Sequence, residues 1–207
     1  MEDSNIEDKI KNLEEWNSER AKIKPILETA VELHNKARRE AYWKNHEKAA
    51  EFFKQAIENY RSTLRLNPKY YLRDIMERVD SVIEEYVNNI FNLKVSGDRL
   101  KTEEGVKEFL EFMEGLKTDE IKYIDQYEIA MNYFKIAEIY FEDGNFDRAY
   151  EFYNKTITLQ CNRPFLNRDA YFKIGKILFN KKRFKEALFS FVCMLSFDRD
   201  NVDAVDY

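Results

Sequence analysis

Apolar residues recur along most of the chain at spacings of three and four, which is the period of one face of an α-helix. The clearest stripe is formed by Tyr133, Ile136, Ala137 and Tyr140. After the turn sequence "EDGN" a second stripe follows, formed by Phe146, Ala149, Tyr153 and Thr156. Gly144 can adopt the left-handed conformation that ends a helix. This stretch therefore predicts two helices joined by a tight turn.

The same pattern returns 38 residues further along the chain. The second copy consists of Tyr171, Ile174, Gly175, Leu178, Phe184, Ala187 and Phe191. A weaker copy lies 100 residues before the first one and consists of Leu33, Ala37, Ala49, Phe53 and Ala56. An internal period of this length indicates a helical repeat protein.

Small residues occupy the point at which the two helices of a hairpin are expected to cross. Ala137 on the first helix and Ala149 on the second would meet there. A larger side chain would force the helices apart, at a cost of roughly 1–3 kcal/mol. The neighbouring Tyr and Phe residues then fill the space where the helices diverge.

These hairpins resemble the tetratricopeptide repeat (TPR), a helical hairpin with small residues at its eighth and twentieth positions and aromatic residues around them. The resemblance implies an all-α fold, a right-handed α-α superhelix of helical hairpins with about nine helices. The usual proline after the second helix is absent near Cys161 and Arg199, and four extra residues around "RPFL" separate the last two units.

The pattern divides the chain into six segments. They are an extra N-terminal helix (1–24), a TPR-like hairpin (25–68), a degenerate hairpin (69–118), two TPR units (119–163 and 164–201), and the start of a further helix or a truncated end (202–207). The extra helix, within residues 5–24, would bury an edge formed by Ile6, Ile10, Leu13 and Trp16. Thr102 would cap the second helix of the degenerate hairpin. Residues 26–93 also fit a three-helix MIT (microtubule-interacting and trafficking) domain. This region by itself does not separate the two, but the clearer repeats downstream favour TPR for the whole chain.

The end of the chain is expected to expose apolar side chains, because the last repeat of a solenoid normally needs a polar cap. Phe189, Leu195 and Phe197 would lack full cover. A second copy of the chain or a further part of a longer protein would supply that cover.

Composition limits the possible partners. The chain is 44% hydrophobic and 35% charged, with a net charge of −5, which disfavours non-specific nucleic-acid binding. It has no recognisable signal peptide and no apolar run of membrane-spanning length. Cys161 and Cys193 do not make a disulfide framework. We therefore expect a cytoplasmic protein that binds neither nucleic acid nor membrane.

No catalytic constellation is visible, so we expect a protein that is not an enzyme and has no cofactor or metal. The chain lacks a P-loop, a dinucleotide-binding glycine pattern, HExxH and CxxC. His34 and His46 are its two histidines and have no obvious metal-binding companions.

The TPR resemblance implies a concave groove lined by the first helices of the hairpins, which would hold a segment of a partner protein. Read onto this chain, the groove positions form three rows: His34, Asn35, Arg38 and Tyr42; Phe134, Lys135, Glu138 and Phe141; and Phe172, Lys173, Lys176 and Phe179. Phe134 and Glu138 stand where Lys and Asn would form the family's carboxylate clamp. The clamp is therefore not expected, and the repeated Phe-Lys pair instead suits a segment with apolar anchors and carboxylates.

Charge is unevenly distributed. Residues 163–185 carry eight Lys or Arg and one acid, whereas residues 103–128 carry nine acids and three lysines. This asymmetry could steer an acidic partner to the C-terminal unit or join two copies head to tail, and solvated helix faces would look the same. The hypotheses are therefore a peptide-binding scaffold, a homo-oligomer assembled through the C-terminal end, and the sensor or interaction part of a longer regulatory protein.

Overall fold

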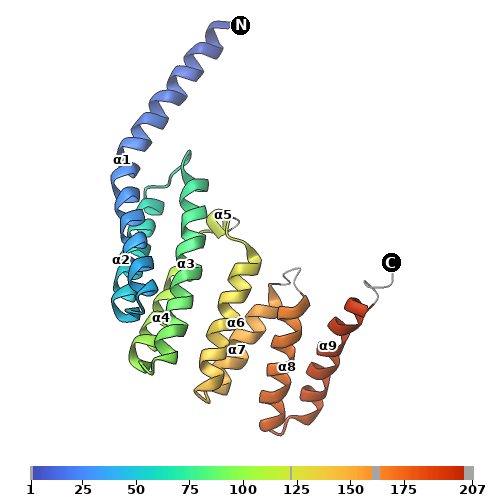
Figure 1. Ribbon diagram of the computed structural model, residues 1–207. Helices are drawn as coiled ribbons and strands as arrows, with labels where there is room; N and C mark the ends of the chain where they lie inside the picture. Colours follow the sequence, from blue (N-terminus) through green and yellow to red (C-terminus); the bar gives the residue numbers. More distant parts are fainter. Residues whose placement is uncertain (1, 122, 160–163, 203–207) are drawn as a thin grey trace. The chain divides into compact units, whose positions relative to one another are not determined.

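The computed structural model describes residues 2–121, 123–159 and 164–202, which form helices and the turns between them (Figure 1). No strand occurs in these residues, so the predicted all-α helical-repeat fold is confirmed. The chain divides into two compact units, 1–124 and 125–207.

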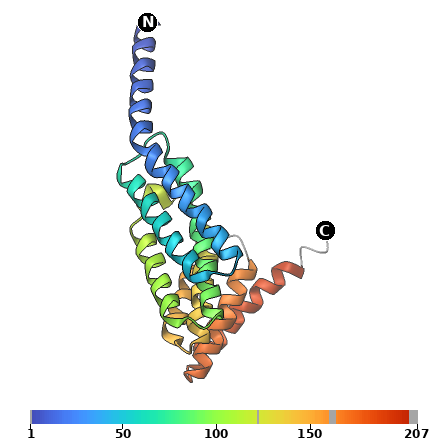
Figure 2. The same cartoon turned by 60° about the vertical axis from the view of Figure 1, so that its left-hand side comes forward.

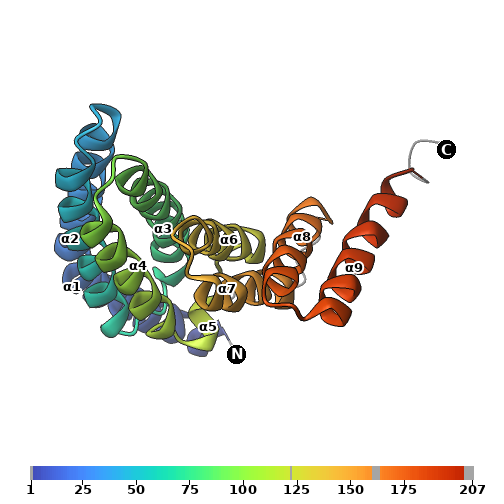
Figure 3. The same cartoon turned by 90° about the horizontal axis from the view of Figure 1, so that it is seen from below.

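Unit 1 contains two helical hairpins. Its helices are α1 (Glu2–Tyr42), α2 (His46–Arg65), α3 (Leu72–Val95), α4 (Arg99–Glu114) and the single turn α5 (Thr118–Ile121). Seen along the helix axes in Figure 3, α1 and α2 form one layer, and α3 and α4 form the next. The layers meet chiefly where α2 packs against α3. The apolar side chains at helical spacing along one face of α3, from Ile75 to Leu93, are buried.

One predicted cap in unit 1 is wrong. The helix begins at Arg99, and the carboxylate of Asp98 accepts a hydrogen bond from the backbone N–H of Lys101. Thr102 lies inside the helix and donates its hydroxyl proton to the carbonyl of Asp98, at 2.6 Å. Both residue types can cap a helix, and the sequence alone did not decide which of the two is the first non-helical residue.

Unit 2 contains two further hairpins, α6 (Gln126–Glu142) with α7 (Phe146–Thr158) and α8 (Pro164–Asn180) with α9 (Phe184–Val202). The helix α7 packs against both α6 and α8. Ala137 and Ala149 have no exposed surface, as expected for small residues at a helix crossing. The neighbouring rings of Phe152 and Tyr153 are fully buried and fill the space around them.

The hairpin turns share one backbone geometry. Gly144 has φ of +73°, as predicted, and the backbone N–H of Asn145 bonds to the carbonyl of Tyr140 at 2.9 Å. Lys44 and Lys182 occupy the equivalent positions of two other hairpins, with φ of 61° and 60°. A lysine in this left-handed conformation is strained by its Cβ atom, whereas glycine is not.

Lys182→Gly is therefore expected to raise the free energy of unfolding by about 0.5–1 kcal/mol, because it removes that strain while the turn hydrogen bonds stay. Gly144→Ala, which adds a Cβ atom at the equivalent position of the preceding hairpin, should lower the free energy of unfolding by a similar amount. Urea denaturation followed by far-UV circular dichroism measures both. A destabilised Lys182→Gly variant would show that the lysine side chain contributes more than its strain costs.

The predicted N-terminal helix is wrong in its boundary and, apart from the half-buried Trp16, in its buried edge. Residues 5–24 are the first part of α1, a single 41-residue helix that continues through Pro25. Ile6, Ile10 and Leu13 are 54%, 51% and 60% exposed. Their spacing suits a packed edge, but α2 has 20 residues and ends before it could cover them. Figures 1 and 2 both show this part of α1 running past the end of α2.

At the other end of the chain, α9 continues to Val202 without the expected break, and residues 203–207 lie outside the described part. Phe189 and Leu195 are exposed, as predicted. Phe197 is half-buried, because its ring stacks on Tyr171 with a centroid distance of 5.9 Å.

Candidate functional site

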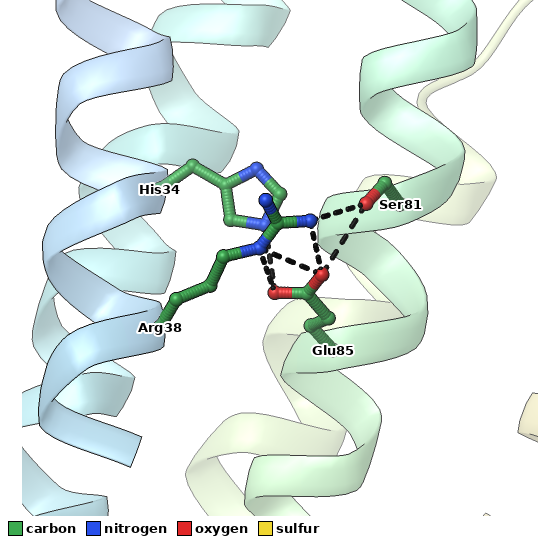
Figure 4. A network of polar contacts seen from close by, with 4 residues as sticks. All are labelled: His34, Arg38, Ser81 and Glu85. Carbon is green, nitrogen blue, oxygen red and sulfur yellow. Dashed lines mark hydrogen bonds and ion pairs between the residues drawn. The ribbon is translucent and has the colours of Figure 1, made fainter. Parts of the chain in front are cut away.

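The first of the three predicted rows is engaged largely within unit 1. His34 and Arg38 on α1 face Glu85 and Ser81 on α3, and the four residues form a network (Figure 4). The Nε2 atom of His34 lies 3.0 Å from a carboxylate oxygen of Glu85. A carboxylate accepts but does not donate, so Nε2 carries the proton. Arg38 donates from Nε to both carboxylate oxygens of Glu85, at 2.8 and 2.7 Å, and from Nη2 to the Ser81 hydroxyl at 3.0 Å.

The network determines the charge state of Glu85. Burial alone would raise the pKa of this carboxyl, but the hydrogen bonds and positive charges of His34 and Arg38 outweigh burial and lower the pKa to about 2. The carboxylate therefore remains ionised at neutral pH. His34 and Arg38 join α1 to α3, and they are already satisfied by partners in the same unit.

The rest of the first row is divided between two places. Asn35 is exposed and faces the space between α1 and α3. Tyr42 is exposed at the hairpin turn, where it packs edge-on against Trp43 with a centroid distance of 5.3 Å. His34, Asn35 and Arg38 nevertheless line one polar cavity, and Tyr42 is not among the residues that line it.

His46 is likewise engaged, since its Nδ1 atom lies 3.0 Å from the side-chain oxygen of Asn89. Within the described ranges, no group of three or more His, Cys, Asp or Glu residues could hold a metal ion. No helix among those ranges is both long and apolar enough to cross a membrane.

A groove lies between α1 and α3, the first helices of the two hairpins of unit 1, and apart from Asn35 the sequence did not indicate the residues that line it. It has a volume of about 620 Å³, and its apolar walls consist of Trp16, Ile23, Leu27, Val31 and Tyr71. Arg20, Lys24 and Arg78 also line this α1–α3 groove, together with Glu28 and Glu32. Asn35 is the predicted site residue that it contains.

A smaller polar cavity of about 300 Å³ adjoins the α1–α3 groove and shares Val31, Asn35 and Arg78 with it. Tyr60 on α2 also lines it, and the Tyr60 hydroxyl is buried without a hydrogen-bond partner in the described part of the chain. Burial raises the pKa of Tyr60, so the hydroxyl keeps its proton at neutral pH.

Part of the second predicted row, on α6, is already engaged in contacts within unit 2. Glu138 accepts a hydrogen bond from the Tyr153 hydroxyl and forms an ion pair with Lys173 on α8, with an Nζ–O distance of 2.7 Å. Phe134 packs edge-on against Tyr153, with ring centroids 5.5 Å apart. Lys135 is half-buried. Glu138 and Lys173 therefore join α6 to α8 and neutralise each other.

The third row leaves an open stripe on α8. Phe172, Lys176 and Phe179 fall at i, i+4 and i+7, and the two phenylalanines are 42% and 56% exposed. The Nζ atom of Lys176 lies 5.5 Å from the ring centroid of Phe172 and 5.7 Å from that of Phe141. Lys176 forms no ion pair with any residue that the structure describes. These three residues, called the α8 stripe below, are the part of the predicted site that remains available.

Helical hairpins with small residues at their crossings are typical of a helical-repeat protein. Exposed side chains on the first helices are typical of repeat proteins of the interaction type. The family model "Tetratricopeptide repeat" matches residues 130–160 and 169–199. The chain therefore contains two tetratricopeptide repeats, one at each of these segments. The model does not extend to residues 26–93, where the choice between a TPR and an MIT hairpin stays a prediction.

The solved structures that are similar to the chain include two of MamA. "Crystal structure of MamA" is 20% identical, with a TM-score of 0.40, and the match covers 74% of this chain and 92% of that one. "Crystal structure of MamA protein" is 18% identical, with a TM-score of 0.39, and the match covers 85% of this chain and 95% of that one. A sequence search of curated proteins finds no significant match.

Proposed function

We propose that this chain is a non-enzymatic interaction scaffold that binds an acidic segment of a partner protein on the α8 stripe of unit 2. The two tetratricopeptide repeats support the general role, since such repeats present surfaces for other proteins. The observation that carries the specific site is Lys176, an exposed cation that lies about one helical turn from each of two exposed phenylalanines on α8, without an acidic partner among the described residues.

The α8 stripe suits a segment with two apolar side chains on either side of a carboxylate. The rings of Phe172 and Phe179 lie one turn to either side of Lys176 and can each cover an apolar anchor. Lys176 would then meet the carboxylate at the edge of an apolar surface, where water screens the attraction less than in bulk solvent. Each ring also has one aromatic neighbour, Phe191 or Phe184, which limits its movement.

Lys173 has a different role from that of Lys176 in this proposal. Its ammonium group lies 4.7 Å from the Phe141 ring centroid and is paired with Glu138. It therefore positions α8 against α6 and contributes little free charge for a ligand. Substitution of Lys173 would disturb the packing of the two helices, so it is a poor probe of binding.

Selection of random peptides on the purified protein tests the proposal. The wild-type chain should enrich peptides in which an Asp or Glu lies between apolar residues, and Lys176→Glu should weaken their binding at least tenfold. Phe172→Ala and Phe179→Ala should each weaken it by a similar factor, because anchor residues dominate such interfaces. Fluorescence anisotropy with one enriched peptide gives the dissociation constants.

Lys185→Glu is the matched control, because it makes the same change in net charge at an exposed position on α9. It should leave the affinity within about twofold, and the effect of Lys176→Glu should shrink at 0.5 M salt. Equal binding by the wild type and Lys176→Glu, or an equal loss in Lys185→Glu, would contradict the assignment of the site.

A second candidate function is self-association through the outer face of α9. Its exposed apolar residues are Phe184, Leu188, Phe189, Val192 and Leu195. Leu188 and Leu195 are the counterparts, 38 residues on, of Tyr150 and Ile157 on α7, which are half-buried. Since α7 packs against α8 on its far side, α9 presents the surface on which one more helix would pack. A Leu188→Glu variant with a lower mass in solution than the wild type would favour this candidate.

A further inference from the structure

We propose that the first part of α1, residues 2–15, is a docking arm that lies antiparallel in the α1–α3 groove of a second copy of the chain. Each copy would insert its arm into the groove of the other, which gives a closed dimer. This inference concerns unit 1 alone and does not depend on peptide binding to the α8 stripe.

The arm has an apolar edge that its own chain does not cover. Ile6, Ile10 and Leu13 follow one another at intervals of four and three residues, and more than half of each side chain's surface is exposed. Residues 12–19 of α1 contact the α2–α3 connection, through Tyr70 and through the stacked rings of Trp16 and Tyr71. These are the contacts of α1 with this connection that lie nearest to the N-terminus. A helical segment without tertiary contacts gains little stability in water. Cover by another helix would stabilise the arm and bury its apolar edge.

The groove begins on the same helix, directly after the arm. The side chains of Ile23, Leu27 and Val31 continue the apolar edge and line the groove, and so do the stacked rings of Trp16 and Tyr71. At 1.5 Å per residue, Ile6 to Leu13 spans about 10 Å and Ile23 to Val31 spans about 12 Å. The apolar edge of an arm therefore matches the apolar wall of the groove in length.

Charge determines the direction of the arm. The sequence of residues 2–15 carries six acids and two lysines, whereas residues 19–24 carry three basic residues and one acid, Glu19. The carboxylate of Glu19 is already used, since it accepts hydrogen bonds from the backbone N–H groups of residues 69–71, at 2.9–3.2 Å. An antiparallel arrangement therefore places the acidic arm of one copy beside Arg20 and Lys24 of the other.

The acidic groups of the groove do not oppose this arrangement. Glu32 is paired with Lys36, with an Nζ–O distance of 2.8 Å. Glu28 lies 3.6 Å from Lys24, but both side chains are more than half exposed, and a pair of this kind contributes little, so Lys24 can still meet a carboxylate of the arm. A parallel arrangement would instead bring two acidic arms together. Because one helix carries both the arm and a groove wall, a two-fold axis near Trp16 satisfies both copies at once, as in an isologous interface.

Sedimentation equilibrium of the full chain over a wide concentration range tests the dimer. The wild type should dimerise, and Ile10→Glu with Leu13→Glu should raise the dimer dissociation constant at least tenfold. Both side chains are exposed within the copy that carries them, so the circular dichroism spectrum and the melting temperature of the monomer should not change. Leu188→Glu on α9 is the control and should leave the dimer intact.

A charge exchange tests the antiparallel direction. Arg20→Glu with Lys24→Glu should weaken the dimer at least tenfold, and adding Asp8→Lys with Glu14→Lys in the same chain should restore most of the lost affinity. A wild-type chain that is monomeric at every concentration overturns the proposal. A dimer that persists in the arm variant but is lost in Leu188→Glu also overturns it, because the contact would then lie on α9. A charge exchange that fails to restore affinity overturns the antiparallel arrangement.

Discussion

Glu85→Ala is expected to lower the free energy of unfolding of unit 1 by about 2–4 kcal/mol, because it leaves His34 buried without its acceptor and removes both carboxylate contacts of Arg38. His34 is only 5% exposed, so the substitution leaves a largely buried imidazole N–H without its carboxylate acceptor. Both tryptophans of the chain, Trp16 and Trp43, lie in unit 1. Their fluorescence during urea denaturation therefore reports on this unit specifically.

Glu77→Ala is the matched control on the same helix. Glu77 forms an exposed ion pair with Arg73 one turn away, and pairs of this kind contribute roughly 0.3–0.5 kcal/mol. If Glu85→Ala costs no more than Glu77→Ala, the network of His34, Arg38, Ser81 and Glu85 does not stabilise the contact of α1 with α3.

Glu85 also makes the free energy of unfolding depend on pH, with a definite sign. The pKa of Glu85 in the folded chain, about 2, lies below its ordinary value of 4.5. The network therefore stabilises the fold fully above about pH 4.5 and loses this effect as the pH falls toward 2. The stability difference between the wild type and Glu85→Gln should shrink by roughly 2–3 kcal/mol over that interval. A difference that is constant with pH would contradict the lowered pKa.

Gly175→Ala is expected to destabilise unit 2 by about 1–2 kcal/mol, although alanine is the better helix former by about 1 kcal/mol. A Cβ atom at this position would lie 2.5–2.8 Å from three atoms of the Phe191 ring. Since real contacts of a Cβ atom are longer, the ring or the backbone of α8 must move. Native-state hydrogen exchange in α8 and α9 measures the loss where it arises.

Phe191→Leu provides the test of that cause. In the Phe191→Leu variant the aromatic ring is absent, so Gly175→Ala should become neutral or stabilising. The two substitutions should therefore be coupled by at least 1 kcal/mol in a double-mutant cycle. If Gly175→Ala stabilises the wild-type chain, helix propensity outweighs the crowding, and α8 and α9 are less tightly packed than this arrangement implies.

The sequence by itself determined the repeated hairpin. The periods of the apolar stripes, the glycine of the "EDGN" turn and the alanines at the helix crossing are local features, and each has one favourable backbone or packing solution. The buried Ala137 and Ala149 and the positive φ of Gly144 follow directly from them. The exposed apolar side chains of α9 were also foreseeable, because none of the described residues follows α9 as a further helix that could cover it.

Other features depended on which helices lie side by side. The spacing of Ile6, Ile10 and Leu13 predicts an apolar edge, but only the shorter length of α2 leaves that edge exposed. No local pattern links His34 to Glu85, which lie 51 residues apart.

The same holds for the candidate site. The sequence placed Lys173 and Lys176 in one row of a binding surface, whereas Glu138 on α6 neutralises Lys173 and leaves Lys176 open. The α1–α3 groove likewise arises from two helices that are distant in the sequence. Local patterns determine which face of a helix is apolar, but only the tertiary structure decides whether a particular side chain on that face meets a partner or remains available, because each such contact depends on the length and register of a second helix.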